Sequence, residues 1–497
     1  MSKKPNIILL FEDHKAFYGH GQMGHGPEIH KPNFERVAKE GVEFTNSYTA
    51  CPLCGPARRT ILTGLYPHNH GEIKNESNED YKDDLYFDKL AQAGYENYYF
   101  GKWHAGKGTA LDFNCKGFSV PGYGNPYTTP EYKKYLKEND LEYIQVRIKK
   151  NFIDPISKNL GIKEGDLYSF KFPAYSEYVS SVMTTPKETY EAFFLVSMAF
   201  DALKKIVKEG NKQPFHMRID FWGPHEPYVA PQEYIDMYDP KKIPKHPNFI
   251  DNFDSKPELY KKQNGYLLSK DKQLILPNPL PWDEWQKVLA VNYAEQTLID
   301  DAGGILLNTL DDLGLTDNTV VIWAADHGDA VACHGGHFDK DAYMPQEVIR
   351  VPLAMRCPDL IEPGTCEKFV SNVDYGPTFL DIAGTSFGSP IDGESLLPLC
   401  TQEDVNWRED LFVEHHGHFT TIVGRSVISN RYKYIYNEGY MDELYDLKND
   451  PWELQNLINK KDYKDILEDM KNRLKKWREK TGDDVEFSMI RGKKLER

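Results

Sequence analysis

Residues 319–327 read T-V-V-I-W-A-A-D-H, a run of β-branched and apolar residues that ends in Asp326 and His327. An unbroken run of this kind predicts a strand buried on both faces, as in a parallel sheet. Residues 6–11 (N-I-I-L-L-F) predict a second such strand, and residues 13–14 (D-H) follow it. In open α/β sheets, sites form at the carboxyl ends of strands. Both polar pairs are therefore candidates for a single site.

Helical and strand-like segments alternate through much of the remaining chain. Helical spacing over residues 33–40 and 86–93 stops each time at a glycine, which is a common helix end. This alternation predicts an α/β fold with a mostly parallel central sheet that helices flank. Further strands are expected at residues 97–100, 214–221 and 349–355, and a long helix at about 284–312.

Length and periodicity predict two domains of unequal size. A chain of 497 residues exceeds the usual size of one domain. Residues 1–385 are expected to form the larger α/β domain, with insertions of weak periodicity at about 120–190 and 230–280. Residues 386–497 are expected to form a smaller C-terminal α+β subdomain. Its strand-like stretches are 411–414, 421–428 and 431–436, and its charged helix is expected at about 460–479.

Charge and cysteine content limit the classes of function. The formal net charge of −16 argues against nucleic acid as a partner, because phosphate binding needs clustered Lys and Arg. A small anionic substrate is still compatible, since a pocket on an acidic protein can be locally positive. No apolar run reaches the roughly 20 residues of a membrane helix, and the N-terminus has no signal-peptide pattern. We therefore expect a cytoplasmic protein without a membrane partner. The seven cysteines, an odd number, fit reduced thiols.

Two further groups of polar residues follow expected strands. Lys102 and His104 come after the strand at 97–100, and His225 comes after the strand at 214–221. A single residue of this kind is more often a helix cap or a loop residue than a functional one. Four groups at equivalent strand ends, however, predict that they converge on one pocket.

Three of these residues have the donors of a metal ligand. Asp13, Asp326 and His327 supply the oxygen and nitrogen atoms that a hard or borderline divalent cation prefers. Asp326 could instead cap a following helix. Its direct pairing with His327 in A-A-D-H-G-D favours the metal interpretation.

The segment 51–64 (C-P-L-C-G-P-A-R-R-T-I-L-T-G) carries the sharpest pattern in the chain. Cys51 and Cys54 form a C-x-x-C pair, which could be redox-active or could be half of a zinc site. The sequence has no second C-x-x-C, which disfavours the zinc interpretation. Cys54 could also be a buried structural cysteine. A third interpretation rests on resemblance to a known family.

The run C-G-P-A-R-R-T-I-L-T-G closely resembles the signature of type I sulfatases. That signature is Cys or Ser, any residue, Pro, a small residue and Arg, followed at fixed spacing by an aliphatic residue and Thr-Gly. Other segments agree in order: P-N-I-I-L-L-F-E-D at 5–13, K-P-N-F-E-R-V-A-K-E-G-V-E-F-T-N-S-Y at 31–48, G-K-W-H at 101–104, G-P-H-E-P-Y at 223–228, A-D-H-G-D at 325–329 and D-E-L-Y-D-L-K-N-D-P-W-E-L-Q-N-L at 442–457. The chain is identified as a member of the formylglycine-dependent, arylsulfatase-like sulfatases of the alkaline phosphatase superfamily. This resemblance implies an alkaline-phosphatase-like α/β fold.

The resemblance also implies a role for each matching residue. In this family C-x-P-x-R directs a separate maturation enzyme to oxidise Cys to Cα-formylglycine, and here that residue is Cys54. The implied metal ligands are Asp13, His14, the modified Cys54, Asp326 and His327. The implied catalytic residues are Cys54 itself, Arg58 and Lys102 as groups that hold the formylglycine hydrate, His104 as the base, and His225 and Lys340 as groups that bind sulfate and the leaving oxygen.

Two departures from the family pattern bear on this site. The family often has two successive Asp residues after the first strand, whereas the second residue here is His14. A neutral His removes one negative charge, so Mg²⁺ or Mn²⁺ becomes conceivable beside Ca²⁺, the usual family metal. The loop before Lys340 is also about one residue longer than usual, so His334 or His337 could share the role of that lysine.

The implied chemistry is hydrolysis of sulfate monoesters. A formylglycine hydrate has two hydroxyl groups: one attacks sulfur, and the other loses its proton so that C–O cleavage expels sulfate. A carbohydrate or aryl sulfate is the expected substrate, because 13% of the residues are aromatic and aromatic rings stack on such groups. Specificity is expected from the insertion at 120–190 and from side chains elsewhere. These are Trp282, Trp285, His415, His416 and His418.

Alternative functions share much of this pattern. A phosphonate monoester or phosphodiester hydrolase of the same fold is the main one, because phosphate and sulfate esters are nearly isosteric. A two-metal phosphatase needs a second set of Asp and His ligands, and the sequence pattern does not supply one. A catalytically inactive binding protein would lack Cys54 or the metal ligands, and the chain has them all.

Overall fold

The computed structural model describes residues 4–15, 28–75, 77–152, 155–175, 177–265, 267–401, 405–486 and 489. Among these residues, eight strands form one sheet in the order β15-β2-β14-β13-β1-β9-β4-β5. Every neighbouring pair is parallel except those that involve β14. The strands are β1 (Asn6–Glu12), β2 (Val42–Phe44), β4 (Glu96–Lys102), β5 (Cys115–Val120), β9 (Phe215–Asp220), β13 (Thr319–Ala325), β14 (Leu353–Arg356) and β15 (Gly364–Cys366). The prediction of a mostly parallel central sheet is confirmed.

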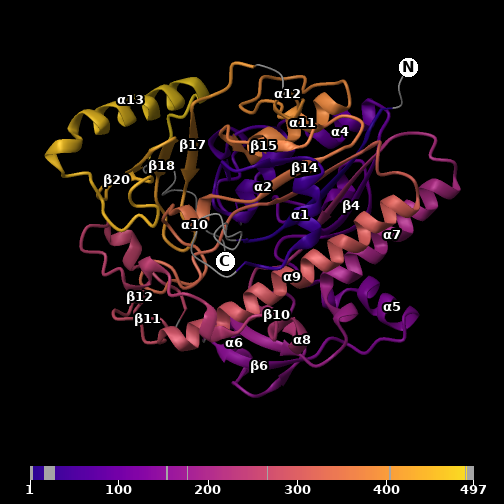
Figure 1. Cartoon of the computed structure of the whole chain (residues 1–497), viewed down its shortest axis with the longest axis horizontal. Helices are drawn as coiled ribbons and strands as arrows, with labels where there is room; N and C mark the ends of the chain where they lie inside the picture. The colour runs from indigo at the N-terminus through magenta and orange to yellow at the C-terminus, as the bar shows by residue number, and fades with distance from the viewer. Residues whose placement is uncertain are drawn as a thin grey trace.

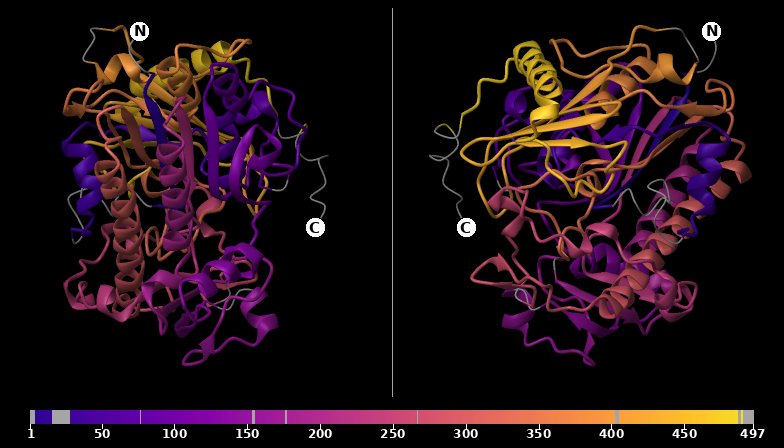
Figure 2. Two further views of the ribbon diagram at one scale, coloured as in Figure 1. Left: turned by 90° about the vertical axis from the view of Figure 1, so that its right-hand side faces the viewer. Right: turned by 60° about the vertical axis from the view of Figure 1, so that its left-hand side comes forward.

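Strand β1 lies at the centre of this sheet because both of its faces are apolar. Ile8 and Leu10 belong to one hydrophobic cluster, and Ile7 and Leu9 belong to another on the opposite face. This alternation follows from the two-residue period of a strand. Helices cover both faces, with α7 and α9 side by side on one of them (Figures 1 and 2). The flanking helices are α1 (Pro32–Lys39), α7 (Glu191–Lys208) and α9 (Trp282–Asp312) on one face, and α2 (Cys54–Thr63), α4 (Tyr86–Gln92) and α11 (Tyr375–Ile382) on the other.

The long helix α9 packs closely against the sheet. A Cβ atom at Gly303 would lie 2.3 Å from the ring of Trp323 in β13, so only glycine permits this approach. The first half of α9 continues past the sheet and packs on a second, smaller sheet.

That smaller sheet occupies the region where weak periodicity led us to expect insertions. Its strand order is β10-β8-β6-β7, and it forms the lower part of the molecule in Figure 1. Its regular structure was not predicted, because β8 reads V-S-S-V-M and does not alternate. The elements here are α5 (Pro130–Glu138), β6 (Val146–Asn151), α6 (Pro155–Leu160), β7 (Leu167–Tyr168), β8 (Val179–Met183), β10 (Tyr228–Pro231), α8 (Gln232–Ile235), β11 (Ser269–Lys270) and β12 (Gln273–Leu274).

The C-terminal part of the chain forms a third sheet, which is antiparallel. Its order is β17-β18-β19-β20, and α13 packs on it. Tyr66 and Val373 join the same hydrophobic cluster as Phe412 and Trp477, so this sheet packs directly on the larger α/β part. The domain division at about residue 385 stays a prediction. The elements are β17 (Asp410–His415), β18 (Gly424–Ser429), β19 (Tyr432–Asn437), β20 (Glu443–Asp446) and α13 (Lys464–Thr481).

One expected strand was placed wrongly. The segment 349–355 was predicted to be a strand, but α10 (Gln346–Ile349) ends where that strand should begin, and β14 starts only at Leu353. A short apolar run does not distinguish a buried helical turn from a buried strand. The remaining short elements are β3 (Ser47–Tyr48), α3 (Pro67–His70), β16 (Val370–Ser371) and α12 (Leu397–Cys400).

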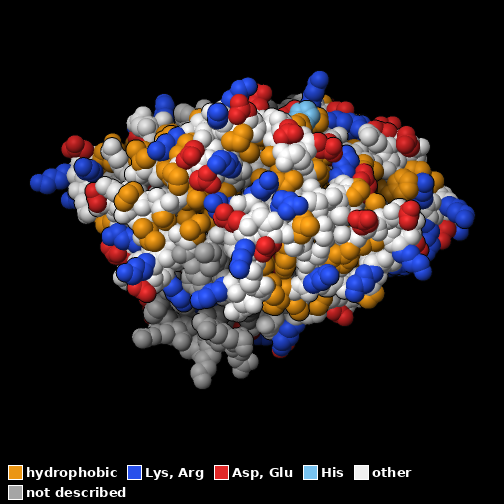
Figure 3. Space-filling view, turned by 90° about the horizontal axis from the view of Figure 1, so that it is seen from below, with side chains coloured by type: hydrophobic (Ala, Val, Ile, Leu, Met, Phe, Trp, Pro, Cys, Tyr) orange, Lys and Arg blue, Asp and Glu red, His pale blue; other side chains and the backbone are white. Residues whose placement is uncertain are grey.

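The face of the molecule that lies at the bottom of Figure 1 carries charges of both signs. Seen from below, acidic and basic side chains are interspersed with hydrophobic ones (Figure 3). Within the described part of the chain, no helix combines the length and the apolar content needed to cross a membrane.

Candidate active site

The predicted site residues meet at one edge of the main sheet. Asp13 follows β1, Asp326 follows β13, and Lys102 is the last residue of β4. The strands β13, β1, β9 and β4 are consecutive and parallel, so their carboxyl ends lie together. Asp220, the last residue of β9, completes the row.

Helix α2 brings Cys54 to this edge. Cys54 is the first residue of the helix, whose amino end carries a partial positive charge and favours anions. The helix ends at Gly64, which adopts the left-handed conformation with φ 68°. Sγ of Cys54 lies 3.1 Å from Nε2 of His327 and 3.6 Å from Oδ1 of Asp13.

Four of these side chains have the arrangement of a metal site. Ligand atoms of Asp13, Cys54, Asp326 and His327 all lie within 4.8 Å of one another, and all four residues are buried. The backbone N–H groups of His14 and His327 donate to Oδ1 of Asp326, at 2.9 and 2.8 Å, and fix its carboxylate. Two carboxylates and an imidazole fit a hard or borderline divalent cation.

Two cations hold the carboxylates from the side. Nε of Arg58 lies 3.0 Å from Oδ2 of Asp326, and its Nη1 lies 2.7 Å from Oδ2 of Asp220. The ammonium group of Lys102 contacts Oδ2 of Asp13. Burial and the Asp326 carboxylate act to raise the pKa of Asp13, but Lys102 and Arg58 outweigh them and lower it. Asp13 is therefore ionised at neutral pH.

The thiol of Cys54 is not a ready nucleophile. Burial, together with the Asp13 carboxylate, raises the pKa of Cys54 to about 12. Burial also raises the pKa of Cys51 well above its ordinary value. All seven cysteines lie within the described residues and are free thiols. A protonated, buried pair does not suit the C-x-x-C redox interpretation, since thiolates carry that chemistry.

The other predicted catalytic residues lie around this group. His104 is buried and left-handed, with φ 41°, a conformation that non-glycine residues adopt mainly where the fold demands it. Burial and the neighbouring Lys102 lower the pKa of His104 well below its ordinary value. Nζ of Lys340 lies 3.0 Å from Oδ1 of Asp339, and the hydroxyl of Tyr123 lies 2.8 Å from Nε2 of His225.

His14 turns away from the first group of ligand atoms. Its side chain belongs to a second buried group with His225, Glu226 and Asp339. The His14 ring lies 4.9 Å from the ring of His327, so the two groups are neighbours. Sequence reasoning missed Glu226, Asp339 and the Arg58 partner Asp220, although G-P-H-E-P and F-D-K contain the first two beside chosen residues.

The two histidines that could share the role of Lys340, and most of the residues expected to set specificity, contact residues outside this site. His334 pairs with Asp251 and Glu347, and Nε2 of His337 donates to the carbonyl of Tyr260. His418, in contrast, lies near two of the site residues. Burial lowers the pKa of His418 to about 4, and of the neighbouring charges Asp339 raises this pKa and Lys340 lowers it. The others are engaged as follows: Trp282 packs on Phe249, Trp285 on Phe152, His415 contacts the carbonyl of Asp341, and His416 pairs with Glu414.

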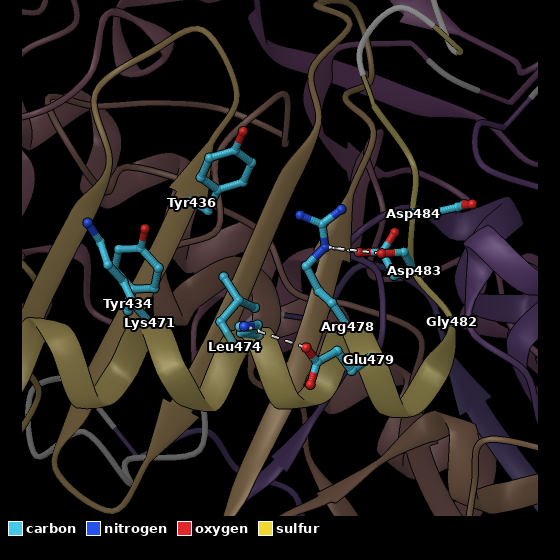
Figure 4. A pocket seen from close by; sticks show the side chains of 10 residues that line it. Tyr434, Tyr436, Lys471, Leu474, Arg478, Glu479, Gly482, Asp483 and Asp484 are labelled. Carbon is cyan, nitrogen blue, oxygen red and sulfur yellow. Dashed lines mark hydrogen bonds and ion pairs between the residues drawn. The ribbon is translucent and has the colours of Figure 1, made fainter.

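A surface pocket lies apart from these residues, between α13 and β19. Tyr434, Tyr436, Leu474 and Arg478 are among its lining residues, and Nε of Arg478 lies 2.9 Å from Oδ2 of Asp483 (Figure 4). None of the converging site residues lines it.

The chain is similar to known proteins over most of its length. A family model described as Sulfatase matches residues 5–385, and the C-terminal model of N-sulphoglucosamine sulphohydrolase matches residues 333–480. The chain belongs to the sulfatase family. This sulfatase is accordingly a sulfuric ester hydrolase, as the resemblance implied.

Individual relatives match this chain over almost its full length. The chain is 26% identical to an N-acetylglucosamine-6-O-sulfatase of Bacteroides thetaiotaomicron, over 99% of this chain and 90% of the relative. It is 27% identical to an arylsulfatase of Clostridium perfringens, over 94% of this chain and 92% of the relative.

Solved structures show the same fold. A protein in complex with its substrate D-glucosamine-2-N,6-O-disulfate has a TM-score of 0.71 and 22% identity, and the match covers 97% of this chain and 99% of that one. A phosphonate monoester hydrolase of Agrobacterium radiobacter has a TM-score of 0.72 and 22% identity, with 96% of each chain covered. The expected alkaline-phosphatase-like α/β fold is confirmed.

Proposed function

We propose that this sulfatase hydrolyses carbohydrate sulfate esters and that Cys54, once oxidised to formylglycine, is its nucleophile. The observation that carries the proposal is the position of Cys54. Its Sγ atom is the point at which Asp13, His327 and the amino end of α2 converge. A nucleophile that attacks an anionic ester benefits from a nearby helix amino end and from side chains that can hold a metal ion.

The unmodified thiol does not meet the chemical requirement. With a pKa of about 12, caused mainly by burial, Cys54 is protonated at neutral pH. A thiol that did attack sulfur would also lack the second hydroxyl that expels sulfate. A formylglycine hydrate has that second hydroxyl, which supports oxidation of Cys54 by a maturation enzyme that reads C-G-P-A-R.

The proposed metal ligands are Asp13, Asp326, His327 and the modified Cys54. By family resemblance the cation is Ca²⁺, with Mg²⁺ or Mn²⁺ as alternatives. When bound, it would offset charge on the sulfate oxygens and acidify a hydroxyl group at residue 54. His14 supports the site through its backbone N–H, which donates to Asp326.

The surrounding side chains suit the remaining tasks. His104 stays neutral at physiological pH because burial and Lys102 lower its pKa, so it is able to accept a proton. Burial disfavours the charged form of Lys340, but the Asp339 carboxylate raises its pKa overall, so its ammonium is able to bind a sulfate oxygen. Arg58 and Lys102 would hold the hydroxyl groups of residue 54. His225 would donate its N–H to the leaving oxygen.

The functions of relatives support a sulfated sugar as substrate. One relative is an N-acetylglucosamine-6-O-sulfatase, and a structure of the same fold holds D-glucosamine-2-N,6-O-disulfate. A phosphonate monoester hydrolase has the same fold, so a phosphonate monoester or phosphodiester is the alternative substrate class.

A substrate panel tests the proposal. The full chain, co-produced with a formylglycine-generating enzyme, is assayed on sulfated glucosamines, aryl sulfates, phosphonate monoesters and phosphodiesters. We expect the highest kcat/KM on a sulfated sugar, and Cys54→Ala should be inactive on all substrates. A higher kcat/KM on the phosphonate or phosphodiester would favour the alternative.

A further inference from the structure

Tyr123 contacts three of the predicted catalytic side chains, although the sequence pattern did not single it out. Nζ of Lys102 lies 4.1 Å from the centre of the Tyr123 ring, and the ring of His104 lies 5.3 Å away, edge to face. The hydroxyl oxygen of Tyr123 lies 2.6 Å from Nδ1 and 2.8 Å from Nε2 of His225. Tyr123 therefore lies among the groups to which the proposed function gives roles at the leaving oxygen and at residue 54.

The fold holds Tyr123 in this position. It follows β5, which pairs in parallel with β4, so its loop starts at the same edge of the sheet as Lys102. Nε1 of Trp222 donates to the carbonyl oxygen of Gly124 at 2.8 Å. This hydrogen bond fastens the loop of Tyr123 to the segment that leads to His225, so the contact between the two side chains is built into the backbone.

The hydrogen bonds of His225 determine which group of the pair can donate a proton. Nδ1 lies 2.8 Å from the carbonyl oxygen of Glu226, which can only accept. A buried histidine is mainly neutral at pH 7, so Nδ1 carries the one ring proton and Nε2 has a lone pair. The hydroxyl of Tyr123 is therefore the donor to Nε2. Burial raises the pKa of Tyr123 well above its ordinary value, so the phenol keeps its proton at neutral pH.

Tyr123 also lies on the side from which a substrate enters. Cys54 and His327 are fully buried, whereas Tyr123 is partly exposed to solvent. A sulfate ester whose sulfate group reaches residue 54 must extend its sugar or aryl group toward the exposed side. The proposed function places the leaving oxygen at His225, and the Tyr123 hydroxyl is in direct contact with that ring. The hydroxyl is therefore within reach of the leaving oxygen.

We propose that Tyr123 is a further catalytic residue of this sulfatase, whose hydroxyl donates its proton to the leaving oxygen while Nε2 of His225 orients that hydroxyl. As the bond from sulfur to the leaving oxygen breaks, the electron pair goes to the oxygen and the phenolic proton follows it. Lys102, on the face of the ring, offsets the charge of the tyrosinate, which regains a proton from solvent after the alcohol has left.

The proposal rests on the proposed function and deepens it. It assigns to the Tyr123–His225 pair the donation that the proposed function gives to His225 alone. The reason is the Nδ1 proton of His225, which is engaged with the carbonyl oxygen of Glu226.

The dependence of the rate on the leaving group tests the proposal, because an acidic alcohol leaves without a proton and a sugar alcohol does not. Wild type and Tyr123→Phe are each co-produced with a formylglycine-generating enzyme. Both are assayed on a sulfated glucosamine and on aryl sulfates that range from 4-nitrophenyl to 4-methylphenyl sulfate. Phenylalanine keeps a ring over Lys102 and removes only the hydroxyl. We expect kcat/KM of the variant to fall about 100-fold on the sulfated sugar and to change little on 4-nitrophenyl sulfate.

Tyr143→Phe is the matched control, because it removes a hydroxyl that donates to the carbonyl oxygens of Tyr127 and Phe170, outside the site. This variant should keep the wild-type kcat/KM on every substrate. An equal loss of Tyr123→Phe on all substrates, or no loss on the sulfated sugar, would overturn the proposal. A wild-type protein without turnover on any of these sulfate esters would contradict the proposed function itself.

Discussion

Nε2 of His327 lies 3.1 Å from Sγ of Cys54, and both side chains are fully buried. Nδ1 of the same ring lies 2.9 Å from the carbonyl oxygen of Gly328, which can only accept a hydrogen bond. Nδ1 therefore carries the proton of the neutral ring, and Nε2 presents a lone pair to residue 54. Burial, with the Lys340 charge, lowers the pKa of His327 to about 4, so this state holds at neutral pH. Two ligands of one cation are expected to face each other in this way.

Removing Asp326 should abolish both metal binding and turnover. The variant Asp326→Ala loses a proposed ligand and the partner of Arg58 and of two backbone N–H groups. We expect kcat/KM to fall at least about 1,000-fold, measured together with metal content. The exposed control Asp359→Asn should change neither. Unchanged turnover by metal-free Asp326→Ala protein would reject the site.

Removing the Lys102 charge should weaken catalysis without unfolding the protein. The ammonium group contacts Oδ2 of Asp13 and lies 4.1 Å from the ring centre of Tyr123. In Lys102→Met, Asp13 loses its nearest cation and residue 54 loses a proposed hydrogen-bond donor. We expect kcat to fall about 100- to 1,000-fold while the melting temperature changes little. A wild-type kcat in this variant would contradict a role of Lys102 in catalysis.

The pair His68–Glu414 should make stability depend on pH. Nδ1 of His68 lies 2.6 Å from Oε2 of Glu414. Burial alone would lower the pKa of His68, but Glu414 raises it to about 9. Because the folded pKa exceeds the unfolded value of about 6.5, the stabilisation is complete below pH 6.5 and is lost as pH rises through 9.

Chemical denaturation at two pH values checks this linkage. His68→Gln should lower the free energy of unfolding by about 3 kcal/mol at pH 6 and by much less at pH 9.5. Lys107→Gln, which removes an exposed partner of Asp80, is the control and should have little effect at either pH. Equal destabilisation of His68→Gln at both values would contradict the assigned charge state.

Cys51 and Cys54 should differ completely in their effect on activity. Cys51 is buried. Among the described residues, it is not part of the ligand group formed by Asp13, Cys54, Asp326 and His327. Cys51→Ala should keep most of the turnover, whereas Cys54→Ala should lose essentially all of it and remain folded by circular dichroism. Comparable losses in the two variants would favour a C-x-x-C pair instead.

The buried strands could be predicted from sequence because their signal is local. The run at 319–325 matches β13 (Thr319–Ala325) at both ends, because its β-branched residues favour a strand and the polar Asp326 ends the apolar run. The prediction for segment 349–355 failed because Ile349 ends the helical turn α10 and the strand starts only at Leu353. The short strands of the lower sheet were missed because β8 carries serines on buried positions.

Site residues could be predicted where they directly follow a strand. They could not be predicted where tertiary contacts determine the direction of a side chain. Asp13, Asp326 and His327 stand directly after apolar runs, so the sheet edge brings them together. The side-chain direction of His14 could not be predicted, because its left-handed backbone, with φ 62°, turns the ring toward Glu226. Glu226 itself lies in a loop, and only the folded chain shows that it faces His14.

The state of residue 54 is the most direct test of the account. Peptide mass spectrometry is applied to protein made with and without the maturation enzyme, and sulfatase turnover is measured on the same samples. We expect active protein to carry a residue lighter than Cys by the difference between CH₂SH and CHO, and unmodified protein to be nearly inactive. Full sulfatase turnover by protein with a proven thiol at residue 54 would contradict the account.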